Sequence, residues 1–148
     1  MICLGNICRS PIAEGVMRAK IEKYGIAAQV DSCGTAGYHI GQSPDHRAIQ
    51  TLKNYTIDIS NLKGRQFQIS DFDHFDLIYT MDSNNYSDII ALARNDKDKK
   101  KVKLLLNESY PDSQKVVPDP YYGDFKDFEH TYRLVEEACE IIAKRLSK

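Results

Sequence analysis

The chain has 148 residues, with four Cys and no Trp, and its 20 Lys+Arg nearly balance 21 Asp+Glu for a formal net charge of −1. A composition of 42% hydrophobic and 28% charged residues is typical of a globular protein of this length, so we expect residues 1–148 to form one domain. The low charge argues against nucleic-acid and anionic-membrane partners, and the absence of a membrane-length apolar run or a signal-peptide pattern makes the cytoplasm the expected location.

Apolar and amphipathic segments alternate along the chain. Ser10-Pro11 and Ser43-Pro44 are typical helix starts, because a capping residue precedes a proline that the first turn tolerates. The expected helices run over residues 11–24, from 43–44 to about 55, 86–94 and through the apolar stripe at 134–146. Besides the residues before Cys3, the expected strands are 29–31, 75–81 and 101–106.

Strands that alternate with helices predict an α/β fold with a doubly wound, mostly parallel four-stranded sheet and helices on both faces. In such sheets ligands bind at the carboxyl ends of the strands. Four Cys are too few for a disulfide scaffold, and in a reducing compartment they should be free thiols, one of which can be chemically active.

A candidate phosphate-binding loop follows the first strand, between Cys3 and the helix start at Ser10-Pro11. Backbone N–H groups at a helix N-terminus are free to bind an anion, and Gly5 and Asn6 readily take the positive φ that turns such groups inward. Arg9 can add a bidentate fork to a tetrahedral oxyanion, and the same field favours the thiolate form of Cys3. The alternative is that both loop cysteines are buried small side chains and Arg9 is a surface residue.

A second candidate element is Pro118-Asp119-Pro120-Tyr121-Tyr122-Gly123, in which flanking prolines stiffen an extended loop. Taken alone it is most often a surface turn. Beside a thiolate nucleophile, Asp119 can protonate the oxygen that leaves when a phosphate ester is cleaved. Tyr121 and Tyr122 can form the walls of a slot for a flat aromatic ring.

With these motifs the chain resembles the low-molecular-weight protein tyrosine phosphatases over essentially its whole length. The matching segments are CLGNICRSPIAE at 3–14, VDSCG at 30–34, SPDHRA at 43–48, FDLIYTMD at 75–82 and DPYYG at 119–123. The resemblance implies that Cys3 attacks phosphorus to form a phosphocysteine, and that Asp119 protonates the leaving phenol and then activates water. It implies a tyrosine-phosphorylated protein substrate and no metal or cofactor. The implied phosphate-binding residues are Leu4, Gly5, Asn6, Ile7, Cys8, Arg9 and Ser10.

The resemblance also implies supporting roles. Ser10 bonds the sulfur of the nucleophile, and Asn6, supported by Ser32, holds the strained turn of the loop. Cys8 matches a second loop cysteine that can pair with the nucleophile on oxidation and protect it reversibly. The residues implied to line the phenyl-ring slot are Leu4, Ile7, Tyr38, Tyr121 and Tyr122.

The chain departs from the family pattern in two places. Only Met1 and Ile2 precede the nucleophile, where the family has five or six apolar residues. Either this sequence starts late or the first strand is nearly absent, which would weaken the sheet and leave the loop less firmly held. Asn61 stands where the family commonly has a His that supports the loop Asn, and we expect Asn61 to take over that support as a group that cannot titrate.

Three other functions compete with this interpretation. An arsenate reductase would need two further cysteines on a mobile segment, whereas only the widely separated Cys33 and Cys139 remain. A protein-arginine phosphatase tends to have a small polar residue where Ile7 stands. A phosphotyrosine-binding module would not need an intact set of Cys3, Arg9 and Asp119.

The remaining charged features are expected to be structural. The four His (39, 46, 74 and 130) show no metal-ligand spacing and should lie at the surface, with His46 in the first turn of a helix. Residues 96–103 should form a solvated loop that enters a strand. Asp71, Asp73 and Asp76 lack the Gly and terminal Glu of a calcium loop and should be turn and cap residues.

Overall fold

Four parallel strands lie at the centre of the protein. In the computed structural model, which describes residues 1–148, they are hydrogen-bonded in the order β2-β1-β3-β4. Ile2 of β1 lies opposite Cys33 on one side and Thr80 on the other, so the short first strand is an interior strand. The strands are β1 (Ile2–Cys3), β2 (Cys33–Gly34), β3 (Ile78–Thr80) and β4 (Val102–Leu104).

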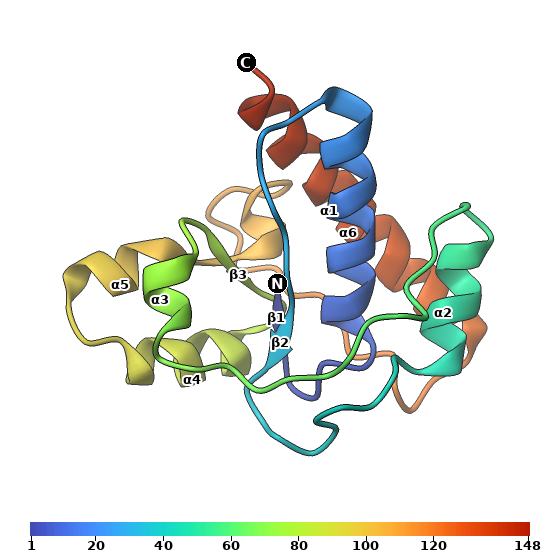
Figure 1. Cartoon of the computed structure of the whole chain (residues 1–148), viewed down its shortest axis with the longest axis horizontal. Helices are drawn as coiled ribbons and strands as arrows, with labels where there is room; N and C mark the ends of the chain where they lie inside the picture. The colour runs from blue at the N-terminus through green and yellow to red at the C-terminus, as the bar shows by residue number, and fades with distance from the viewer.

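Helices cover both faces of the sheet (Figure 1). One face carries α1 (Arg9–Tyr24), α2 (His46–Lys53) and α6 (Phe125–Leu146), and α1 packs along α6. The other face carries α3 (Asp71–His74), α4 (Ser83–Leu92) and α5 (Asp96–Lys101), and a 3-10 turn, η1 (Leu105–Asn107), follows β4. The predicted doubly wound, four-stranded α/β fold is confirmed, and the sheet is wholly parallel.

Local capping signals determine where the helices begin and end. α1 ends at Gly25, whose φ of 59° is the left-handed conformation that glycine adopts without strain. Asp45 caps α2 by accepting a hydrogen bond from the backbone N–H of Arg47. Asp124 and Asp127 form a reciprocal capping box at the start of α6, so that this helix begins directly after the DPYYG segment.

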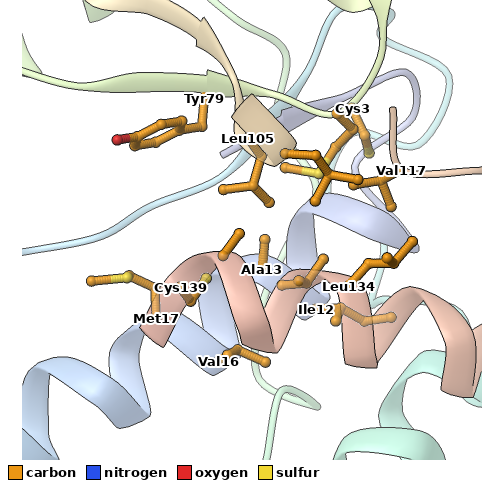
Figure 2. Close-up of a cluster of buried hydrophobic side chains, with 14 of the residues drawn as sticks. Cys3, Ile12, Ala13, Val16, Met17, Tyr79, Leu105, Val117, Leu134 and Cys139 are labelled. Atoms are coloured by element: carbon orange, nitrogen blue, oxygen red, sulfur yellow. The ribbon is translucent and has the colours of Figure 1, made fainter. Parts of the chain in front are cut away.

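Two hydrophobic cores of unequal size lie on the two faces of the sheet. The larger contains 21 buried residues between the sheet and α1 and α6, and Figure 2 shows Leu105 pointing from the sheet side toward those two helices. The smaller contains seven, among them Phe72 and Ile89. Successive residues of a strand face opposite sides, and accordingly Ile2 belongs to the smaller core and Cys3 to the larger.

Several element boundaries differ from the sequence prediction. The strand expected at 29–31 is wrong: those residues are exposed or half-buried, and the pairing with β1 falls on Cys33–Gly34. The loop expected at 96–103 is helix α5 as far as Lys101, because Asn95 caps it and Asp98, which is buried, pairs with Arg94. The short helix α3 was not predicted, and the terminal helix begins nine residues before the apolar stripe. No helix has the length and apolar character needed to cross a membrane.

Leu105→Ala should lower the free energy of unfolding by about 2–5 kcal/mol, because the side chain is fully buried and its removal leaves a cavity. Urea unfolding followed by circular dichroism measures this change. Leu92→Ala is the matched control: Leu92 is 45% exposed, so its loss should change the free energy by no more than about 0.5 kcal/mol. Equal effects of the two substitutions would contradict the position of the core.

Candidate active site

Residues 4–8 form the loop that joins β1 to α1, and they surround the sulfur of Cys3. No side chain caps the N-terminus of α1, so its first N–H groups are free to bind an anion. Asn6 has a φ of 58°, and the turn directs its N–H toward Cys3 Sγ at 3.3 Å. Cys3 is only 3% exposed, at the floor of the loop.

The Asn6 side chain holds this turn through three hydrogen bonds. Its amide nitrogen donates to Ser10 Oγ at 2.7 Å and to Ser32 Oγ at 2.9 Å, and its amide oxygen accepts from the backbone N–H of Arg65 at 3.0 Å. Ser10 Oγ accepts from Asn6, and its one proton has two acceptors within reach, Cys3 Sγ at 3.0 Å and the carbonyl of Cys33 at the longer distance of 3.4 Å. The predicted roles of Asn6, Ser10 and Ser32 therefore have the geometry they require.

A buried carboxylate extends this network into α1. Ser32 Oγ donates to Glu14 Oε1 at 2.7 Å, and Glu14 is only 3% exposed. The other oxygen of Glu14 accepts a hydrogen bond from Arg18 one turn along the helix. The charge is therefore paired as well as hydrogen-bonded, as a buried carboxylate requires.

Arg9 is the first residue of α1, and its guanidinium is held from two sides. Its Nη1 donates to Asp82 Oδ2 at 2.6 Å and to the carbonyl of Val117 at 3.1 Å. Asp82 lies two residues after β3, so this contact lies at the carboxyl edge of the sheet. The Nη2 group lies 3.7 Å from Asp119 Oδ2, which brings the predicted general acid to the predicted phosphate-binding arginine.

Asp119 lies on an exposed loop, and its side chain is 44% exposed. Its Oδ1 accepts a hydrogen bond from the backbone N–H of Tyr121 at 3.1 Å, which leaves Oδ2 directed toward Arg9. The buried Pro120 anchors the loop between these two residues.

A pocket of about 260 Å³ opens over the loop and brings ten of the predicted site residues together. Tyr121 and Tyr122 meet edge to face, with ring centroids 4.9 Å apart, and with Tyr38 they give the mouth an aromatic lining. The residues that line it are Cys3, Leu4, Gly5, Ile7, Cys8, Arg9, Tyr38, His39, Asp119, Tyr121 and Tyr122.

The prediction that Asn61 supports the loop is wrong. Asn61 is exposed, and all three polar contacts of the Asn6 amide go to Ser10, Ser32 and Arg65. The Asn6 amide oxygen instead accepts a hydrogen bond from the backbone N–H of Arg65. A main-chain donor can replace a side chain here because Arg65 O also accepts from Gly34 N–H, which holds this stretch beside β2.

Three residues of the site were not predicted from the sequence to belong to it. Asp82 could have been found, because it ends the FDLIYTMD segment where a strand meets a helix. Glu14 belongs to a matched segment, but its burial has no signal in the periodicity. His39 was expected to be a surface residue, yet it is half-buried over Gly5 and lines the pocket.

Comparison with known proteins identifies the family. The model of the family described as low molecular weight phosphotyrosine protein phosphatase matches residues 1–148. The chain belongs to this family. It is therefore a protein tyrosine phosphatase, a hydrolase, and its substrates are phosphotyrosine proteins.

Individual relatives of the phosphatase span nearly its full length. It is 42% identical to the low molecular weight phosphotyrosine protein phosphatase of Schizosaccharomyces pombe over 88% of this chain and 85% of that protein. A crystal structure of a protein tyrosine phosphatase from Entamoeba histolytica matches with a TM-score of 0.90 and 35% identity, over 98% and 93% of the two chains. The arginine phosphatase YwlE of Bacillus subtilis has a similar fold, with a TM-score of 0.88, 25% identity and coverage of 99% and 93%.

Asn6→Ala in the phosphatase should weaken inhibition by inorganic phosphate at least about tenfold, equivalent to about 1.4 kcal/mol, because alanine is strained at positive φ and lacks the amide. Asn61→Ala is the control and should leave the inhibition constant unchanged. Competition between phosphate and an aryl phosphate substrate gives both constants. Comparable weakening in both variants would restore the role that the sequence suggested for Asn61.

Proposed function

We propose that the phosphatase works in two steps through a phosphocysteine intermediate. In the first, Cys3 Sγ attacks phosphorus, the S–P bond forms as the P–O bond to the tyrosine ring breaks, and Asp119 gives its proton to the leaving oxygen. In the second, the Asp119 carboxylate takes a proton from water, whose oxygen attacks phosphorus and displaces the Cys3 thiolate. The observation that carries the proposal is that Cys3, Arg9 and Asp119 line one pocket.

The loop supplies the charge stabilisation that these steps need. Arg9 and the inward N–H groups of residues 4–9 would bind the three phosphoryl oxygens in both steps. Because Asp82 and the Val117 carbonyl already orient the Arg9 guanidinium, little reorganisation accompanies substrate binding. The Ser10 hydroxyl would stabilise the sulfur as it carries charge, both before attack and when it leaves. This assignment includes no metal or cofactor.

Two features of the pocket favour an aryl phosphate. Leu4, Ile7, Tyr38, Tyr121 and Tyr122 would contact the faces of the phenyl ring. Tyr38 is 73% exposed and Tyr122 94% exposed, so both rings stand at the mouth, where they would also contact the protein that carries the phosphotyrosine. The apolar Ile7 argues against phosphoarginine, in line with the lower identity to YwlE.

The chemistry of the cysteines disfavours an arsenate reductase. Cys33 and Cys139 are buried and neither lines the pocket that contains Cys3, and Cys139 lies in the interior of α6. Burial raises the pKa of both thiols to about 12. Cys8 lines the pocket beside the nucleophile, and we assign to it reversible pairing with Cys3 on oxidation. Burial, with a contribution from Asp45, raises the pKa of the Cys8 thiol above its usual range.

The proposal includes one catalytic domain formed by residues 1–148 and a cytoplasmic location. The match of the family model to all of these residues supports the first, and four free cysteines support the second, because thiols persist in a reducing compartment.

Cys3→Ser should abolish hydrolysis of a chromogenic aryl phosphate, because the serine hydroxyl is a far weaker nucleophile than a thiolate at neutral pH. Phosphate binding should persist, since the loop and Arg9 are unchanged. Steady-state rates with and without EDTA, and phosphate binding by calorimetry, measure these effects. The mechanism would be contradicted if Cys3→Ser turned over substrate nearly as fast as the wild-type enzyme, or if the wild-type enzyme lost its activity in EDTA.

Asp119→Asn should reduce kcat by about 100-fold or more for an aryl phosphate with a poor leaving group and far less for one with a good leaving group, because only a basic oxygen needs the proton. A series of substituted phenyl phosphates gives the dependence of kcat on leaving-group pKa. An equal reduction across the series would exclude Asp119 as the general acid.

A further inference from the structure

We propose that Arg47, in the first turn of α2, is the positioning residue that holds the Asp119 loop against the phosphate-binding loop. The inference rests on the proposed role of Asp119 as general acid. It assigns a role to the SPDHRA segment, which the mechanism described above does not use.

The guanidinium of Arg47 donates hydrogen bonds to two backbone carbonyl groups of the Asp119 loop. Its Nη2 donates to the carbonyl of Tyr121 at 2.9 Å and its Nη1 to the carbonyl of Gly123 at 2.9 Å. The peptide N–H of Tyr121 donates in turn to Asp119 Oδ1. One residue of the loop therefore connects Arg47 to the carboxylate that faces the phosphate site.

Asp45 in turn connects Arg47 to the start of α2 and to the phosphate-binding loop. Asp45 Oδ1 accepts from Arg47 Nε and Asp45 Oδ2 from Nη2, both at 3.0 Å, which sets the plane of the guanidinium. The backbone N–H of Asp45 donates to the carbonyl of Ile7 at 2.8 Å, within the phosphate-binding loop. The guanidinium also stacks on the fully buried ring of Phe128, with Cζ 4.6 Å from the ring centroid.

Apart from the buried Pro120 and the hydrogen bonds of Val117 just before the loop, few other contacts hold it in place. Within residues 118–123, the remaining backbone hydrogen bonds are local, such as Gly123 N–H to Pro120 O. The Asp119 side chain reaches outside the loop only to Arg9, at 3.7 Å. Arg47 therefore provides the two hydrogen bonds that tie this exposed segment to another element, and an error of about 1 Å in placing a catalytic group can cost about 100-fold in rate.

The decisive substitution is Arg47→Met, which keeps an unbranched side chain over Phe128 and removes every donor. With a poor leaving group kcat should fall between about 10- and 100-fold, and with a good leaving group by less than about twofold. The inhibition constant for inorganic phosphate should stay unchanged. Arg133→Met is the matched control, since Arg133 is an exposed arginine of α6 that pairs only with Glu129, and it should change none of these values.

A double-mutant cycle separates positioning from a general effect on the fold. If Arg47 acts through Asp119, then adding Arg47→Met to Asp119→Asn should lower kcat for the poor leaving group no further. Additive losses, or equal losses with both leaving groups, would overturn the inference. Arg47→Lys serves as a second variant if Arg47→Met does not fold; its single ammonium cannot reach both carbonyls and Asp45, so the same selective loss is expected.

The two proposals fail in different ways. A selective loss in Asp119→Asn without one in the Arg47 variants would overturn the role of Arg47 alone. An effect of Asp119→Asn that does not depend on the leaving group would overturn the general-acid role, and the positioning role with it.

Discussion

The left-handed turn at Asn6 is the constraint on which the active site depends. A loop can direct successive N–H groups at one anion only if its backbone enters the positive-φ region, which costs about 1–2 kcal/mol for a residue with a side chain. The protein offsets this cost with the Asn6 amide, whose hydrogen bonds to Ser10, Ser32 and Arg65 would be lost in any other conformation. The same turn brings an N–H to the sulfur of Cys3, so a single conformation shapes the loop and also contacts the proposed nucleophile.

The groups that stabilise this turn come from distant parts of the chain, and the parallel sheet is what brings them together. Asp82 lies two residues after β3 and the loop itself follows β1, whereas Ser32 lies just before the two-residue β2 and reaches Asn6 through its side chain. Parallel strands present their carboxyl ends at one edge, which is where βαβ folds bind ligands. The helical layer adds the remaining parts, with Glu14 beneath Ser32 and Arg47 between the two loops. β1 has hydrogen-bonded neighbours on both sides, which fixes the start of the loop.

The sequence predicted which residues meet in the pocket better than it predicted the supports around them. Cys3, Arg9 and Asp119 could be assigned to one site because each proposed chemical role needs a specific residue type, and because a loop between a strand and a helix start can be recognised from local sequence. The strand was misplaced at 29–31 because β2 is only two residues long and its pairing depends on β1, which local hydrophobicity does not report. Asn61 was misassigned because the donor to the Asn6 amide oxygen is the backbone N–H of Arg65, and a backbone donor has no sequence signature. Arg47 was part of a recognised segment, but its function depends on carbonyl groups more than 70 residues away.

The two carboxylate oxygens of Asp82 connect the N-terminus of α4 to the guanidinium of Arg9. Oδ1 caps α4 through the N–H of Asn85, at 2.8 Å, while Oδ2 holds Arg9. α4 belongs to the layer with the smaller core, and segments with fewer buried apolar contacts are the ones expected to open at lower free energy. Opening of the α4 N-terminus would release Asp82 from Arg9 and leave the guanidinium bonded to the Val117 carbonyl alone, so the anion site would be weakened while the larger core is still folded. By linkage, an anion bound at Arg9 should slow amide hydrogen exchange at the start of α4, a helix none of whose residues lines the pocket.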